Sequence, residues 1–303
     1  MLALLHPVAQ ISLSRFSVHP STVIGIVIVG AIYLWRAHRG PSEADRYPVN
    51  VSPHTATEEQ RLKAAEEPGP TPLMKVSFFT SLALLFLSLN GPLHDLSDYF
   101  LFSAHMLQHL LLTLVVPPLM IYGVADWMLR PLIRNRIVYR IAQANTSTVA
   151  CFVWFNVVLA FWHLPIMYNA ALAHHSLHIV QHLMFISASV LMWWPLLSPM
   201  SELPRASYPV QILYLFLLVI PMSVISIYIT MSDSLLYPAY AAAPRILRIA
   251  PMEDQQYGGL IMWIPGGIFF YLIMTVVFFR WQARGGDDTA SAQVDWVSRP
   301  RQG

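Results

Sequence analysis

The sequence predicts an all-α membrane protein, a polytopic bundle of seven transmembrane helices. Of its 303 residues, 56% are hydrophobic and only 11% are charged, whereas a soluble domain carries about 25% charged residues. Six stretches are long and apolar enough to cross a bilayer, which takes about 20 helical residues, and a shorter seventh precedes them. Because the net charge is only +2, no basic surface for a nucleic-acid partner is expected.

Each predicted span is an apolar run with few or no charged side chains. The six clear runs are 73–89, 99–122, 148–167, 177–197, 208–231 and 258–279. The weaker run 19–35 lacks both the basic start and the small-residue cleavage site of a signal peptide, so we predict that it is retained as the first helix. Together these spans form one transmembrane domain, residues 1–280.

Two polar segments accompany the predicted bundle. Residues 36–75 contain six basic and six acidic side chains and six prolines. Such a segment buries too little apolar surface to fold alone, so we predict a mobile cytoplasmic loop. Residues 281–303 are predicted to form a polar, disordered cytoplasmic tail.

Lys and Arg are divided unequally between the two sets of loops. The loops after the first, third and fifth spans and the C-terminal tail carry 15 of the 18 basic residues, and the opposite set carries 3. Because basic loops are retained in the cytoplasm, we predict the N-terminus outside and the C-terminus inside. The other six spans keep this orientation even without the first one.

Most histidines fall on the predicted outer side. Eight of the 12 lie between positions 94 and 182, in outer loops or in the outer halves of spans that can be neighbours. Residues four apart share a helix face, so His105 and His109 form one pair, and His174, His178 and His182 form a ladder. Two facing helices are therefore predicted to bring three to five imidazoles together.

Gathered imidazoles indicate a metal site, because neutral imidazole binds Cu, Zn, Fe and Ni. No thiolate lies near, since the only cysteine, Cys151, is near the inner end of its span, and no carboxylate triad is evident. These absences argue against structural zinc and non-haem iron, so we predict copper, as Cu(I). The candidate ligands are His105, His109, His163, His174, His178 and His182.

Two of the assignments around this site have alternatives of equal or greater weight. For His163, which precedes Pro165, a hydrogen bond to a neighbouring helix is as good an interpretation as ligation. Met106, Met167 and Met184 lie nearby in sequence as soft ligands for Cu(I), but packing is the commoner use of methionine.

The same histidines permit other functions. His105 or His109 with His178 or His182 would serve as axial ligands of a b-type haem between two helices. A transporter of a metal or small solute is disfavoured, because the last five spans contain no Lys, Arg, Asp or Glu. A structural assembly partner without a ligand is a further alternative. No phosphate-binding loop, nucleophile elbow or zinc-protease motif occurs, so an enzyme is not expected.

Four of the predicted spans carry short blocks of distinctive sequence. These are HMLQH at 105–109 with PPL at 117–119, WHLP at 162–165 with Tyr168, HIVQH at 178–182 with WWPL at 193–196, and DQQ at 254–256 with GG at 258–259 and MWIPGG at 262–267. In this order and on these spans, the blocks resemble the multi-spanning bacterial CtaG family of cytochrome c oxidase assembly factors. The resemblance covers about positions 75–280.

The resemblance implies an assembly factor of the bacterial cytoplasmic membrane that supplies copper to a haem–copper oxidase. The implied partners are the membrane lipid and the oxidase subunit that carries the CuA centre, which faces outside. The predicted orientation places the histidines on that side. A single-span copper chaperone that shares the family's name uses paired cysteines, which this chain lacks.

Overall fold

The structure is a computed structural model that describes residues 17–49, 51–66, 69–245 and 247–285. Within these ranges the chain is helical and has no strand, which confirms the all-α class. Six helices are long and apolar enough to span a membrane, and α9 adds a seventh when taken together with α8, to which it is joined at a 72° bend. The predicted membrane bundle is therefore confirmed. The predicted tail, 281–303, lies outside the described residues except for the end of the last helix.

The membrane-spanning part consists of long helices joined by short ones. The long elements are α1 (Pro20–Arg39), α3 (Pro72–Leu89), α5 (Phe102–Leu110) continued by the π turn η2 (Leu111–Val115) and α6 (Val116–Tyr122), α9 (Thr148–His163), α11 (His175–Leu197), α12 (Tyr208–Thr230) and α13 (Pro251–Ala283). The connecting elements are η1 (Glu43–Arg46), α2 (Glu58–Ala65), α4 (Pro92–Tyr99), α7 (Asp126–Leu129), η3 (Arg130–Ile133), α8 (Arg136–Asn145), α10 (Pro165–Ala173) and η4 (Pro238–Tyr240).

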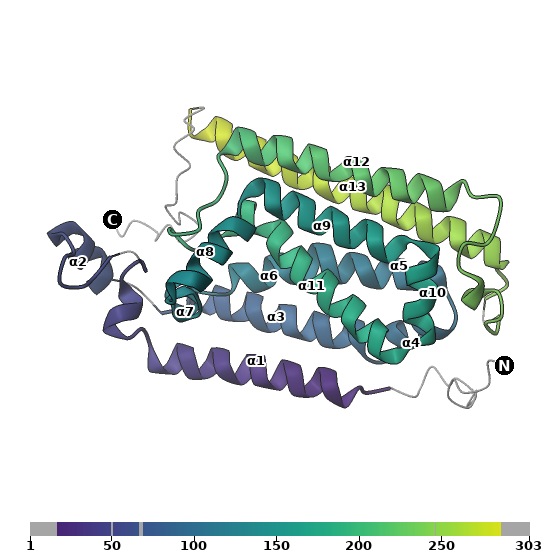
Figure 1. The fold of residues 1–303 in the computed structure, drawn as a ribbon, viewed down its shortest axis with the longest axis horizontal. Helices are drawn as coiled ribbons and strands as arrows, with labels where there is room; N and C mark the ends of the chain where they lie inside the picture. The colour runs from purple at the N-terminus through teal and green to yellow at the C-terminus, as the bar shows by residue number, and fades with distance from the viewer. Residues whose placement is uncertain (1–16, 50, 67–68, 246, 286–303) are drawn as a thin grey trace.

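The broken span α5–η2–α6 forms the centre of the bundle. It packs against α3, α11 and α13, while α1 lies along one side beside α3, and α12 and α13 run together along the other (Figure 1). Over the most apolar 18-residue stretch of this span, 56% of the residues are buried inside the protein, whereas only 11% are buried over the corresponding stretch of α1. More than half of the central span is therefore enclosed by other helices, including the His105 and His109 side chains of α5. The end of the bundle at which α4 and α10 lie is called the histidine end below.

The rotation of α5 is fixed by α13 at the histidine end. The carboxylate of Asp254 accepts hydrogen bonds from the backbone N–H groups of Phe102 (2.7 Å) and Ser103 (3.2 Å) and from the Ser103 hydroxyl (2.5 Å). It thus caps the N-terminus of α5, where N–H groups lack helical acceptors. One turn later, a Cβ on Gly258 would lie 2.2 Å from the Phe102 ring, so glycine permits this close approach.

The break in the central span leaves a carbonyl that α11 satisfies. Pro117 has no N–H, so the carbonyl of Thr113 lacks its usual donor four residues ahead. The indole N–H of Trp193 in α11 donates to this carbonyl at 2.9 Å. Trp193 is buried in the bundle, and this bond holds α11 beside the π turn.

Part of the polar loop is anchored on the bundle. Asp45 in η1 is buried and its carboxylate pairs with Arg36 at 3.2 Å and with Arg134 at 2.5 Å. The Ser42 hydroxyl donates to the same carboxylate at 2.7 Å. Residues 42–46 of the predicted loop therefore contact the bundle through ion pairs and hydrogen bonds, which apolar burial alone would not provide.

The predicted orientation can be tested because the single cysteine is fully buried. In a Cys151→Ala background, Ser176→Cys places a thiol at the exposed start of α11, and Ala144→Cys places one at the exposed end of α8. We expect a membrane-impermeant maleimide to label Ser176→Cys in intact cells and Ala144→Cys only after the membrane is opened. Labelling of Ala144→Cys in intact cells instead would contradict the predicted orientation.

Candidate metal centre

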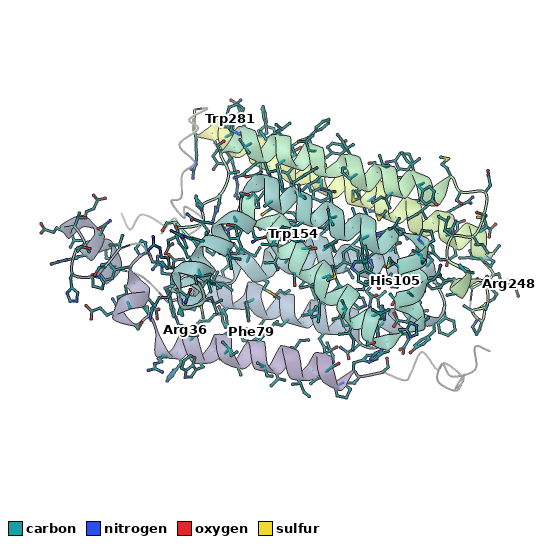
Figure 2. The ribbon with its side chains drawn as sticks, viewed as in Figure 1. Arg36, Phe79, His105, Trp154, Arg248 and Trp281 are labelled. Atoms are coloured by element: carbon teal, nitrogen blue, oxygen red, sulfur yellow. The ribbon has the colours of Figure 1, made fainter. Side chains whose placement is uncertain are left out.

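Five of the six predicted ligands lie together inside the bundle at the histidine end. His105 and His109 project from α5, His178 and His182 from α11, and His163 is the last residue of α9. Each is at most 7% exposed. Figure 2 shows His105 within this end of the molecule. Helix packing therefore brings together residues from three spans.

The sixth predicted ligand, His174, lies apart from this group. Its backbone is extended (φ −130°, ψ 108°), because it precedes the first turn of α11. Its side chain is exposed, and within the described part of the chain no ring contact links it to the other five histidines. The predicted ladder therefore stops at His178, and this geometry does not favour His174 as a ligand.

The five imidazoles form a continuous group. The ring centroids of His105 and His109 lie 4.3 Å apart, and those of His178 and His182 lie 4.4 Å apart. Between α5 and α11, the centroids of His105 and His178 are 5.8 Å apart and those of His109 and His182 are 5.7 Å apart. The ring of His163 lies 6.3 Å from that of His109. Each imidazole thus has another imidazole as a neighbour.

Hydrogen bonds fix the orientation and the protonated nitrogen of two of these rings. Nδ1 of His163 lies 2.7 Å from the Leu159 carbonyl oxygen, and Nδ1 of His178 lies 3.3 Å from a carboxylate oxygen of Asp98. Both oxygens accept, so each Nδ1 carries the proton and each Nε2 keeps its lone pair. These Nε2 atoms are buried and have no hydrogen-bond partner among the described residues. Metal-binding histidines have this arrangement, with one nitrogen oriented by an acceptor and the other free.

A tyrosine orients His105 in the same way. The Tyr240 hydroxyl donates to the Ser97 carbonyl at 2.7 Å, and its oxygen lies 3.3 Å from Nδ1 of His105. The hydroxyl of Tyr168 lies 3.0 Å from that of Tyr240. Since the Tyr240 proton is directed to Ser97, its oxygen accepts from Nδ1 of His105. Nε2 of His105 is therefore also left free and buried.

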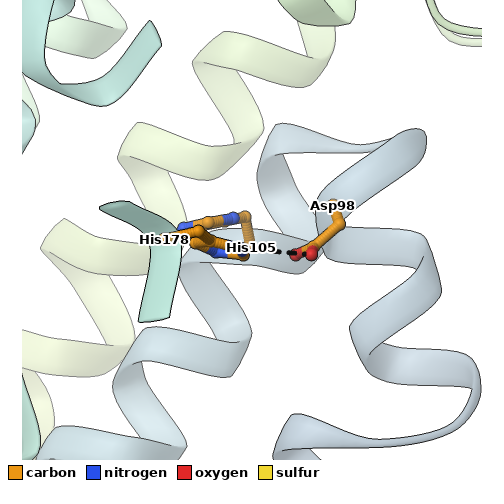
Figure 3. A group of neighbouring side chains, drawn as sticks. All are labelled: Asp98, His105 and His178. Carbon is orange, nitrogen blue, oxygen red and sulfur yellow. Dashed lines mark ion pairs between the residues drawn. The ribbon is translucent and has the colours of Figure 1, made fainter. Parts of the chain in front are cut away.

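Asp98, which the sequence analysis did not identify, completes the group. It lies in α4, facing His105 and His178 (Figure 3), and one potential ligand atom from each of the three residues lies within 4.8 Å of the others. The sequence showed no carboxylate triad, whereas the structure places two histidines and one carboxylate together. A His-x-x-x-Asp spacing after Pro92 was the signal that α4 is a helix with His94 and Asp98 on one face.

His94 connects Asp98 to the rest of the bundle. Its Nε2 lies 3.4 Å from the Asp98 carboxylate, and its Nδ1 lies 3.1 Å from the amide nitrogen of Gln108. The same amide nitrogen donates to the Ser88 carbonyl at 2.6 Å. Because an amide N–H donates to Nδ1, the proton of a neutral His94 is on Nε2 and is donated to Asp98.

The electrostatics of α4 leave one negative charge at the centre. Burial by itself raises the pKa of the Asp98 carboxyl group, but the hydrogen bond from His178 and the electrostatic interactions with His178 and His94 lower it more, to well below its ordinary value. For His94, burial lowers the pKa, and the nearby Asp98 charge offsets only part of this effect. At neutral pH the site thus contains an ionised Asp98 beside a neutral His94, which suits a bound cation.

Comparison with known proteins gives one match. A family model described as "Cytochrome c oxidase caa3 assembly factor (Caa3_CtaG)" matches residues 59–284, well over half of the chain. The matched range contains Asp98 and all five clustered histidines. No curated protein and no solved structure matches the chain significantly.

The role of Tyr240 in orienting His105 leads to a stability prediction. Tyr240→Phe removes the hydroxyl that donates to the Ser97 carbonyl and contacts His105 Nδ1, and a buried group that loses its partner costs about 1–3 kcal/mol. We expect a lower thermal unfolding temperature for the purified protein in detergent. Tyr257→Phe, at an exposed tyrosine of α13, is the matched control and should leave the temperature unchanged. Equal behaviour of the two variants would contradict the proposed hydrogen bonds.

Proposed function

Because the chain belongs to the family of cytochrome c oxidase caa3 assembly factors, we propose that it binds copper in the bacterial cytoplasmic membrane and supplies it to the oxidase subunit carrying the CuA centre. The ligands come from the free nitrogens of the clustered histidines, with His105 and His178 as the primary ligands and the Asp98 carboxylate beside them. The protein binds and releases the ion without catalysing a reaction.

The observation that carries this proposal is a group of buried imidazole nitrogens without hydrogen-bond partners. Among the described residues they are Nε2 of His105, His163 and His178 and both ring nitrogens of His109 and His182. A buried polar atom without a partner costs about 1–3 kcal/mol, and lipid offers no water to reduce that cost. A bound ion would satisfy several of these atoms at once.

Copper is the ion that best fits both the ligands and the family. Sites built from nitrogen and oxygen ligands bind Cu²⁺ more tightly than the other first-row divalent ions, and imidazole also binds Cu(I). Two histidines and a carboxylate also occur as ligands of non-haem Fe(II), so Asp98 makes iron the principal competing metal. The assembly of a haem–copper oxidase requires copper, which favours copper over iron.

Release to the oxidase is consistent with the same ligand set. Cys151, the only cysteine, has its thiol 3.4 Å from the Asn145 carbonyl, near the end of the bundle opposite to the histidines. The candidate ligands near the site are therefore imidazole and carboxylate. These bind Cu(I) less tightly than thiolates do, so a thiolate-containing acceptor site would draw the ion away. The predicted orientation places the histidine end on the outer side, where the CuA centre is expected.

A b-type haem is the main alternative occupant. The cavity that His109 and His163 border has a volume of about 20 Å³, which is the size of a single water or ion and not of a macrocycle. This observation favours an ion. A transporter is a second alternative, and copper uptake into vesicles containing the purified protein would support it.

Metal analysis and an optical spectrum of the purified protein test the binding proposal. We expect copper in the wild type. His105→Ala and His178→Ala should each weaken copper binding at least about tenfold, because even the loss of a residue that only hydrogen-bonds to a metal ligand has an effect of this size. His54→Ala, in the exposed part of the polar loop, is the control and should bind normally. Iron in place of copper, or a Soret band, would contradict the assignment.

The role in assembly makes a separate prediction for cells. A deletion strain should have less active cytochrome c oxidase than the parent, and added copper should restore part of the activity. Complementation with His54→Ala should succeed, whereas the double variant His105→Ala/His178→Ala should fail at low copper. Normal oxidase activity in the deletion strain would rule out the proposed role.

A further inference from the structure

A small cavity lies deeper in the bundle than Asp98. It is lined by residues of α5, η2, α9, α11, α12 and α13 and has a volume of about 20 Å³. Two histidines and three methionines contribute to its wall, namely His109, His163, Met106, Met222 and Met262. The remaining lining residues, all of them described, are apolar apart from Thr113. The wall thus combines imidazole and thioether groups without any charged side chain.

We infer that this cavity is a second metal site, selective for a soft monovalent cation such as Cu(I) and formed by His109 and His163 with thioether ligands. This inference rests on the proposed function, because it gives part of the histidine cluster its own ion. It differs from the Asp98 site in ligand chemistry. Imidazole and thioether are neutral, so a single positive charge is the most that the apolar surroundings tolerate.

The two histidines that line this cavity have ring nitrogens without hydrogen-bond partners among the described residues. Nδ1 of His163 donates to the Leu159 carbonyl, so Nε2 is unprotonated, and it is buried without a hydrogen-bond partner. Neither ring nitrogen of His109 has a partner within the described residues. The two ring centroids are 6.3 Å apart. No hydrogen bond among the described residues satisfies these buried nitrogens beside an apolar wall, whereas an ion between the rings would.

The three methionines converge from different helices. Met106 belongs to α5, Met222 to α12 and Met262 to α13, and none is more than 4% exposed. The sulfur of Met222 lies 3.2 Å from the position that a Cβ on Gly266 would occupy, so the glycine leaves room for the thioether. A single buried methionine is ordinary packing material. Three of them around one cavity with two unpartnered imidazoles indicate a common ligand.

The backbone beside the cavity is irregular. The π turn η2 begins two residues after His109, and the Thr113 hydroxyl donates to the His109 carbonyl at 2.7 Å. Turns of this kind occur mostly at functional sites, because they change which residues of a helix face its neighbours. Here the turn follows the histidine that lines both the cavity and the cluster above it.

The two sites share a border of imidazoles. His105 belongs to the Asp98 site and lies 4.3 Å, between ring centroids, from His109 of the deeper one. An ion can therefore pass from a charged site to a neutral site without leaving the histidines. The Asp98 carboxylate attracts the cation, and the thioethers select the soft monovalent form.

The test is Cu(I) binding by the full-length protein in detergent, measured against a Cu(I) chelator under reducing conditions. We expect the wild type to bind two ions per chain and the X-ray absorption spectrum to contain sulfur among the copper ligands. The triple variant Met106→Leu/Met222→Leu/Met262→Leu conserves side-chain volume. It should bind one ion per chain and lose the sulfur signal. Ag(I), a soft monovalent probe, should bind the wild type and not the deeper site of this variant.

Two controls separate this inference from the proposed function. Met192→Leu changes a buried methionine of α11 that does not line the cavity, and it should keep both ions and the sulfur signal. Asp98→Ala/His178→Ala should lose the first ion and retain the second. A wild type that binds one ion with nitrogen and oxygen ligands alone would overturn the second site and leave the proposed function intact. No binding by the wild type at all would overturn both.

Discussion

In a membrane-spanning chain, every polar group must find its partner inside the protein, and the fold depends on this constraint. The bundle satisfies it with long-range hydrogen bonds at its irregular points. Asp254 of α13 caps the start of α5, and Trp193 of α11 bonds to the carbonyl that Pro117 leaves without a helical donor. The broken central span is held in one rotation because its neighbours supply these partners, and that rotation directs the histidines inward.

The histidine cluster departs from the same constraint. On one side the rings are satisfied, by Asp98, Leu159 and Tyr240, and on the other side their nitrogens are buried without partners. Half-satisfied polar groups destabilise a bundle unless something else occupies the site. The arrangement therefore has the form of a prepared ligand set, in which the protein orients one nitrogen of His105, His163 and His178 and leaves the other for an ion.

The opposite end of the bundle is closed by ion pairs. Arg130, which is 4% exposed, contacts Asp126 at 2.7 Å and Glu202 at 3.2 Å and donates to the Asp45 carbonyl at 2.6 Å. Arg130, which the sequence analysis used only as a signal of orientation, thus also connects η3 to η1 and to the loop after α11. The two ends therefore differ in chemistry, with compensated charges at one and free imidazoles at the other.

The sequence by itself determined the spans and the histidine pairs, because lipid demands long apolar runs and helical geometry places residues four apart on one face. His105 with His109 and His178 with His182 followed from spacing alone. Only the tertiary structure decided that Asp98 and His163 join them and that His174 does not. Those outcomes depend on how α4 folds over the bundle, where α9 ends and where α11 begins. The periodicity of a single segment contains no information about such contacts between segments.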